Sequence, residues 1–213
     1  MDLRAFTVGP LQENAYLVRA DDNAARALLV DPGDEAPRLL AAIDDLGVEL
    51  DAILLTHTHF DHVGAVAAVA RATGARVWCP AGEVEVLADL DAHVGWPEFG
   101  PFESYDADET VAGGEELELA GLVLDVVATP GHSRGHVTYA VRDEAALLSG
   151  DVLFRGSIGR TDLPGGDGAT LMRSIAILTE RFAPESVVLP GHGPATTLGH
   201  ELATNPFLAA AVS

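Results

Sequence analysis

Three histidines and one aspartate lie within six consecutive positions of THTHFDH (residues 56–62), although the whole chain has only eight histidines. In an extended segment His57 and His59 point the same way, because side chains repeat every second residue. Asp61 and His62 follow at the turn into a predicted helix and can face a second point. Imidazole and carboxylate ligands suit zinc, iron or manganese. The run therefore predicts a metal site, since H-x-H-x-D-H is far more specific than an isolated H-x-H.

Three further candidate ligands each follow a different apolar segment. His132 follows VVATPG, Asp151 follows ALLSG and His192 follows SVVLPG. Loops held by a rigid scaffold are where functional residues concentrate, and histidines that merely fill a core would not repeat this placement. Two imidazole clusters joined by one carboxylate would hold two cations about 3.5–4 Å apart.

The segments that position these residues alternate between strand and helix patterns. Short apolar runs bounded by turn residues predict strands, and apolar residues at helical spacing predict helices. The first half contains predicted strands at 5–8, 15–19, 27–31, 52–56 and 76–80, and helices at 35–47, 62–74 and 83–90. The second half contains predicted strands at 115–121, 122–131, 136–141, 145–151 and 186–193, and helices at 169–182 and 199–207. This order predicts two mixed sheets packed face to face with helices outside, in a single domain over residues 1–213.

The composition limits the partners of the protein. Thirty-three Asp and Glu residues face 12 Arg and no Lys, which gives a formal net charge of −21. This charge repels nucleic acid, and no apolar run reaches the roughly 18 residues of a membrane helix. The N-terminus lacks a signal-peptide pattern, so we expect a cytoplasmic protein. The single cysteine, Cys79, is expected to be a buried core thiol, which leaves the metal site without thiolate ligands.

THTHFDH, together with TPGHSRGH, LSGDVLF and LPGHGP, resembles the metallo-β-lactamase superfamily over nearly the whole chain, from ENAYLV to TTLGHELATNPF. The resemblance implies an α/β (α+β) fold, an αββα sandwich built from two similar halves. It also implies two divalent metal ions, zinc first, with iron or manganese as alternatives. By resemblance, the ligands of one ion are His57, His59 and His132, those of the other are Asp61, His62 and His192, and Asp151 bridges both.

Within the superfamily, GSIGRTDLPGGD (residues 156–167) resembles the small glyoxalase II-like hydrolases, whose usual substrate is a glutathione thioester such as S-lactoylglutathione. The implied function is a binuclear metallohydrolase whose substrate is a small-molecule acyl thioester. A metal-bridging hydroxide would attack the carbonyl, because bound cations lower the pKa of water toward about 7, and Asp61 would orient it. The chain ends at Ser213, without the basic helical domain of full-length glyoxalase II, so loose selectivity for the thiol is expected.

An oxidoreductase is the alternative function. Persulfide dioxygenases also resemble this sequence, and they use a single iron held by two histidines and an aspartate. Here these would be His57, His132 and Asp151, a facial triad that leaves positions open for oxygen. The complete second set of candidate ligands favours the hydrolase.

Several residues around the predicted site have two interpretations. His136 is either a hydrogen-bond donor that orients a ligand or a strand histidine satisfied by a backbone partner. Arg160 either meets a substrate carboxylate or pairs with Asp162, and we favour the pairing. The aromatic loop 93–110 is either a substrate lid or a locally packed cluster. The remaining expectations are that Asp31 is a turn residue supporting the site and that His93 and His200 lie at the surface.

Overall fold

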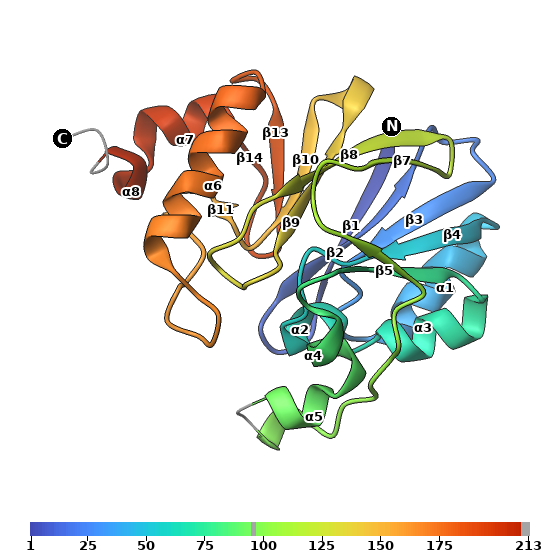
Figure 1. The fold of residues 1–213 in the computed structure, drawn as a ribbon. Helices are drawn as coiled ribbons and strands as arrows, with labels where there is room; N and C mark the ends of the chain where they lie inside the picture. Colours follow the sequence, from blue (N-terminus) through green and yellow to red (C-terminus); the bar gives the residue numbers. More distant parts are fainter. Residues whose placement is uncertain (95–96, 210–213) are drawn as a thin grey trace.

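The computed structural model describes residues 1–94 and 97–209, whose strands form two stacked sheets between outer helices (Figure 1). Within these residues, the first sheet has six strands in the order β1-β2-β3-β4-β5-β6. Pairing is antiparallel from β1 to β3 and parallel from β3 to β6, so β3 to β6 end along one edge. The strands span, in order, Asp2–Val8, Glu13–Arg19, Arg26–Val30, Glu49–Leu54, Arg76–Pro80 and Glu109–Val111.

The second sheet of the described chain also has six strands, in the order β14-β13-β10-β9-β8-β7. β10 and β13 run parallel, and the other neighbours are antiparallel. The strands are β7 (Glu116–Leu119), β8 (Leu122–Ala128), β9 (Val137–Val141), β10 (Ala146–Gly150), β13 (Val187–Pro190) and β14 (Thr196–Thr197), and a small hairpin of β11 (Leu153–Phe154) and β12 (Ser157–Ile158) follows β10. Two mixed sheets, as predicted from the order of the elements, are therefore confirmed.

Helices cover the outer face of each sheet. α1 (Ala36–Leu46) and α3 (Val66–Thr73) pack on the first sheet, and α6 (Gly168–Arg181) and α7 (Leu198–Thr204) pack on the second (Figure 1). Gly47 caps the C-terminal end of α1 with a φ of 63°, which glycine adopts readily. Asp167 caps the start of α6, where its side chain accepts from the Thr170 N–H. The shorter helices are α2 (Phe60–Val63), α4 (Val84–Ala88), α5 (Leu90–His93) and α8 (Pro206–Ala209), with 3₁₀ turns η1 (Pro97–Phe99) and η2 (Arg142–Glu144). None of the helices in the described ranges is long and apolar enough to cross a membrane.

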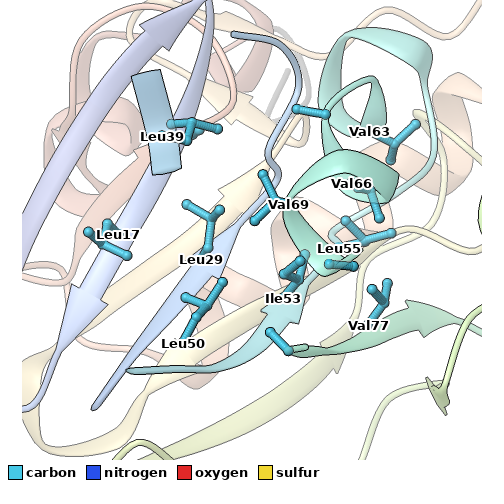
Figure 2. Packing of buried hydrophobic residues seen from close by; sticks show 14 of the residues in the cluster. Leu17, Leu29, Leu39, Leu50, Ile53, Leu55, Val63, Val66, Val69 and Val77 are labelled. Atoms are coloured by element: carbon cyan, nitrogen blue, oxygen red, sulfur yellow. The ribbon is translucent and has the colours of Figure 1, made fainter. Parts of the chain in front are cut away.

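The apolar strand β3 shows why four layers form. Leu29 packs with Val66 and Val69 of α3 in the outer cluster shown in Figure 2. Leu28 and Val30 belong instead to the cluster between the two sheets. Successive side chains of a strand point to opposite faces. A strand that is apolar on both faces needs a partner layer on each side, so the sheets stack and the helices lie outside.

The predicted helix 62–74 is divided into α2 and α3 at Gly64 and Ala65. A Cβ at Gly64 would lie only 2.5 Å from the carbonyl oxygen of Gly33, so the VDPG turn packs directly against this point. The Ala65 N–H donates to the Pro32 carbonyl at 3.0 Å. This contact with a segment distant in sequence interrupts the helix, and helical periodicity could not reveal it.

Strand prediction succeeds where the apolar run is long. RVWCP forms β5 with the predicted bounds, and Cys79 is buried within it, where burial raises the pKa of its thiol. β6, β11, β12 and β14 are only two or three residues long and are not predicted by the pattern. Such short segments carry too little alternation to be recognised.

Two buried tyrosines connect the sheets at strand ends. Tyr139 on β9 donates its hydroxyl hydrogen to the Leu55 carbonyl at 2.9 Å, directly after β4. Tyr16 on β2 donates to the Pro190 carbonyl at 2.7 Å, at the end of β13, and the Asn14 side chain donates to the same oxygen at 3.1 Å. Each sheet therefore holds the end of a strand in the other sheet, at the point where a candidate ligand loop begins.

The Tyr139→Phe substitution is expected to lower the free energy of unfolding by about 1–3 kcal/mol, because the buried Leu55 carbonyl loses this donor. Tyr16→Phe should cost less, since Asn14 still donates to Pro190. Urea denaturation of the purified variants measures both differences.

Tyr105→Phe is the matched control for these variants. Among the described residues, its hydroxyl makes a single 3.5 Å contact, with the Asp108 carboxylate in an exposed setting, so we expect a change within about 0.5 kcal/mol. An equal loss of stability in the Tyr139 and Tyr105 variants would contradict the role of the inter-sheet bond.

Candidate metal centre

The seven candidate ligands all lie where strands of the two sheets end. They are His57 and His59 after β4, Asp61 and His62 on α2, His132 after β8, Asp151 after β10 and His192 after β13. The fold thus brings residues that are far apart in the sequence to one edge of the sandwich. In that arrangement they form two groups with Asp151 between them.

The first group consists of the imidazoles of His57, His59 and His132. His59 Nδ1 lies 3.1 Å from His57 Nε2 and 2.8 Å from His132 Nε2, and the donor atoms of the group lie within 4.8 Å of one another. The other ring nitrogens of His57 and His132 have separate partners. His132 Nδ1 donates to the Arg160 carbonyl at 2.8 Å, and His57 Nδ1 lies 3.1 Å from Thr56 Oγ1. A partner at one ring nitrogen fixes the tautomer and leaves the lone pair of the other nitrogen facing the group.

Burial keeps these three imidazoles uncharged. It lowers the pKa of His57 and His132 below the ordinary value, and it lowers the pKa of His59 to about 4. Repulsion from neighbouring imidazoles adds to the lowering at His57 and His59. Because a metal ion binds the neutral form of imidazole, the protonation state suits a cation site.

The second group consists of Asp61, His62 and His192, whose donor atoms also lie within 4.8 Å of one another. Asp61 Oδ2 is 3.2 Å from His192 Nε2 and 4.0 Å from His62 Nε2. His62 Nδ1 lies 3.0 Å from Asp31 Oδ2, so Nε2 is the nitrogen that faces the group. Two imidazole nitrogens and a carboxylate oxygen therefore meet at a second point.

Asp151 lies between the two groups. Its Oδ1 is 3.5 Å from His62 Nε2, and its Oδ2 is 3.5 Å from His132 Nε2 and 3.7 Å from His192 Nε2. The space is tight, since a Cβ at Gly191 would lie 2.3 Å from Asp151 Oδ1. The two carboxylate oxygens thus reach both donor groups.

Two atoms at the centre of this arrangement, His62 Nε2 and Asp151 Oδ1, are buried and have no hydrogen-bond partner in the described part of the chain. Leaving a buried polar atom unpaired is costly. A cation contacting both would satisfy them, and the nitrogen and oxygen donors suit zinc, iron or manganese. The residues therefore fit divalent metal ions.

Opposite charges stabilise one another in the second group. Burial alone would lower the pKa of His62 and raise that of Asp151, but attraction to oppositely charged neighbours, first of all to each other, outweighs it, so the pKa of His62 is raised and that of Asp151 is lowered. The Asp61–His192 contact acts in the same way against burial, raising the pKa of His192 and lowering that of Asp61. The carboxylates therefore stay charged at neutral pH and attract positive charge.

Asp31 and His136 support the donor groups from outside. Asp31 has a φ of 48° and accepts hydrogen bonds from the Thr56 N–H and hydroxyl, both at 2.7 Å. His136 Nε2 accepts from the backbone N–H of Asp151 at 3.1 Å, and its Nδ1 lies 3.1 Å from Thr129 Oγ1. Asp31 thus bonds to the residue before the first candidate ligand, as expected. His136 has a backbone partner, as in one of its two interpretations, and because that partner is the N–H of Asp151 the contact also holds the backbone of a candidate ligand.

Arg160 and Asp162 form the ion pair favoured from the sequence. The Nε and Nη2 atoms of Arg160 donate to the two carboxylate oxygens of Asp162 at 2.7 and 2.8 Å, at an exposed position. The pair lies in the loop whose Arg160 carbonyl accepts from His132. His93 and His200 are exposed, as expected.

A cavity of about 340 Å³ opens beside Asp61, walled by the turn between β1 and β2 and by the aromatic loop. Within its wall Phe60 stacks on Phe99 with ring centroids 5.0 Å apart, and its centroid lies 5.4 Å from that of Phe102. The described part of the aromatic loop thus packs locally and also lines a space next to the donor groups. Trp96, part of the same prediction, lies outside the described residues.

Sequence reasoning missed two buried glutamates near the donor groups. Glu83, after β5, accepts hydrogen bonds from the hydroxyls of Thr58 and Ser133. Its place just past the end of a parallel strand is a signal that could have identified it. Glu13, at the start of β2, lies 3.8 Å from His62 Nδ1, and burial raises its pKa. Nothing in the local sequence separates Glu13 from the many surface carboxylates.

Comparison with known sequences gives matches over almost the full length. The model of the metallo-beta-lactamase superfamily matches residues 8–192. The probable metallo-hydrolase YqgX of Bacillus subtilis is 40% identical over 209 residues, covering 98% of each chain. The hydroxyacylglutathione hydrolase GloC of Haemophilus influenzae is 35% identical over 214 residues, again covering 98% of each chain.

Solved structures give the same result. The BLEG-1 B3 metallo-beta-lactamase superimposes with a TM-score of 0.90 and 38% identity, covering 97% of this chain and 99% of that one. TTHA1623 in a di-iron-bound form gives a TM-score of 0.84 and 43% identity, covering 96% of this chain and 100% of that one. ETHE1 from Myxococcus xanthus superimposes with a TM-score of 0.80 and 27% identity, covering 99% of this chain and 85% of that one. With its two sheets, its strand-end histidines and aspartates and these full-length matches, the chain belongs to the metallo-beta-lactamase superfamily.

Proposed function

We propose that this protein is a binuclear metallohydrolase that cleaves acyl thioesters. The observation that carries the proposal is the pair of donor groups with Asp151 between them, together with the unpaired buried atoms of His62 and Asp151. When bound, the metal ions supply Lewis acidity, which activates water and polarises a carbonyl group. Zinc is the metal proposed, and the di-iron form of TTHA1623 supports iron as an alternative. The proposed ligands of one ion are His57, His59 and His132, those of the other are Asp61, His62 and His192, and Asp151 is shared.

The chain's own residues position the reactants. Asp61 lines the cavity in which a substrate would lie. Because an ionised carboxylate only accepts hydrogen bonds, Asp61 would orient the attacking water by accepting a hydrogen bond from it. Phe60, Phe99 and Phe102 provide an apolar wall that excludes other water from this side. A thiolate leaves readily because a thiol has a pKa of about 8.5, so the reaction does not require a separate general acid.

The acyl thioester is supported by the hydroxyacylglutathione hydrolase GloC among the relatives and by the segment at 156–167, whose Arg160 carbonyl holds His132. The cavity argues against a strict requirement for glutathione. Its described lining includes the carboxylates of Asp34, Asp61 and Glu98 and no arginine, which is a poor match to the carboxylates of that peptide. We therefore infer loose selectivity for the thiol.

Fully loaded protein is expected to contain about two metal ions per chain, because the proposed ligands other than Asp151 fall into two groups. Asp151→Ala should lose most of the metal and nearly all activity, since it would remove the only ligand shared by both ions. Elemental analysis after gel filtration measures the metal content directly.

His93→Ala is the control, because His93 is exposed and its Nδ1 contacts only the Asp89 carbonyl among the interactions described. It should retain both metal and activity. Comparable losses in the two variants would contradict the ligand assignment. One ion in the loaded wild-type protein would favour the alternative, a mononuclear iron persulfide dioxygenase using His57, His132 and Asp151.

Lactoyl thioesters of different thiols are expected to react with similar kcat/KM values. The test compares S-lactoylglutathione with the lactoyl thioester of N-acetylcysteamine, which carries no charge, at one metal loading. Because catalysis would come from the metal ions and few contacts would hold the thiol, we expect a high KM and a substantial kcat.

A hundredfold preference for glutathione, about 2.7 kcal/mol at 1.36 kcal/mol per decade, would show that a dedicated glutathione site exists. The Asp151→Ala protein gives the background rate in the same assay. If no thioester is cleaved while glutathione persulfide drives oxygen uptake, the hydrolase proposal fails and the dioxygenase replaces it.

A further inference from the structure

Glu83 is a buried carboxylate that contacts the loops on both sides of the three-histidine group, formed by His57, His59 and His132. It lies at the start of α4, after β5, and is only 5% exposed. Its Oε2 accepts from the Thr58 hydroxyl at 2.7 Å. Its Oε1 accepts from the Ser133 hydroxyl and from the Gly135 N–H, both at 2.7 Å. One side chain thus connects a loop of the first sheet with a loop of the second.

The two hydroxyls are adjacent in sequence to the histidines of the group. Thr58 lies between His57 and His59, and Ser133 directly follows His132. Neighbouring side chains of an extended segment point to opposite sides, so the Thr58 hydroxyl faces away from the two imidazoles beside it. Glu83 therefore bonds to the loops on the side that faces away from the imidazoles, and it does not need to contact a metal ion.

The local backbone is shaped for this contact. A Cβ at Gly135 would lie 2.8 Å from Glu83 Cγ, and a Cβ at Gly82 would lie 3.1 Å from the Gly135 Cα. A side chain at either position would push the β5–α4 loop away from the loop that carries His132. The two glycines allow the close approach through which Glu83 reaches all of its donors.

We propose that Glu83 is a positioning residue that sets the separation of His57 and His59 from His132 and thereby the metal affinity of the three-histidine group. This inference rests on the proposed function only for the presence of a metal ion, and not for the identity of the substrate. Hydrogen bonds to a carboxylate are about twice as strong as neutral ones. Without them, the loops from the two sheets are no longer held at one distance, and groups that orient metal ligands typically affect affinity by roughly 10–100-fold.

The test compares Glu83→Ala with Glu83→Gln in the full-length protein. Zinc affinity is measured by chelator competition, and the geometry of the site by the visible absorption spectrum of cobalt-substituted protein. We expect Glu83→Ala to weaken zinc binding at the three-histidine group by roughly 10–100-fold and to change the cobalt spectrum. His59→Ala identifies which dissociation constant belongs to that group. Glu83→Gln should restore wild-type affinity within about threefold, because its amide can still accept from Ser133 and Gly135 and donate to the Thr58 oxygen.

Glu201→Ala is the matched control. Glu201 is also buried and accepts hydrogen bonds from the Thr196 hydroxyl, the Gly156 N–H and the Asn205 amide at 2.5–2.9 Å, away from the donor groups. It should lower the unfolding stability of the metal-free protein as much as Glu83→Ala does, while leaving zinc affinity and the cobalt spectrum unchanged. Equal metal affinity in both alanine variants would show that Glu83 has only a structural role and would overturn the proposal.

Two milder variants decide the question if Glu83→Ala does not fold. Thr58→Val and Ser133→Ala each remove one bond to Glu83, and each should weaken zinc binding at the three-histidine group by a smaller factor than Glu83→Ala. Unchanged zinc affinity in both would overturn the proposal. These measurements need no substrate, so they stand even if thioester hydrolysis is not observed. If it is observed, kcat should fall more than KM changes.

Discussion

The carboxylate of Asp151 is buried between His62, which follows the first sheet, and His132 and His192 of the second sheet. A buried charge is tolerated only when it is paired and hydrogen-bonded. Within the described chain, Asp151 Oδ1 and His62 Nε2 have no hydrogen-bond partner, so protein groups alone do not complete the pairing. The loops around Asp151 must therefore hold the donors of both sheets at positions where cations can contact these unpaired atoms.

Rigid support for these donors comes from hydrogen bonds outside the site. Tyr139 and Tyr16 each cross from one sheet to a carbonyl at a strand end of the other. Asp31 holds Thr56 and faces His62, while Glu83 connects the loops around the three-histidine group. A site is precise only when the side chains that form it are locked by their neighbours. Here the locking residues are themselves buried and link the two halves of the molecule.

Membership in the superfamily defines the fold and the type of metal site, but it leaves the substrate open. The relatives and structural neighbours include the hydroxyacylglutathione hydrolase GloC and the BLEG-1 B3 metallo-beta-lactamase, and one fold commonly supports many activities. The choice of substrate therefore depends on the side chains that surround the donors. In this chain those surroundings are an aromatic wall and acidic side chains, which favour a substrate that carries little negative charge.

The sequence by itself determined the candidate donors, because THTHFDH and the single His or Asp after each later apolar run are local features. It also determined the alternation of long strands and helices, since apolar periodicity is local as well. The grouping of the donors was available from the sequence only through its resemblance to a known superfamily. Tertiary structure alone decided where the helix after His62 breaks and which buried glutamates lie beside the donors. Gly64 meets Gly33, and Glu83 meets Ser133, only after the sheets have stacked. Contacts between residues distant in sequence depend on packing, and no local pattern encodes them.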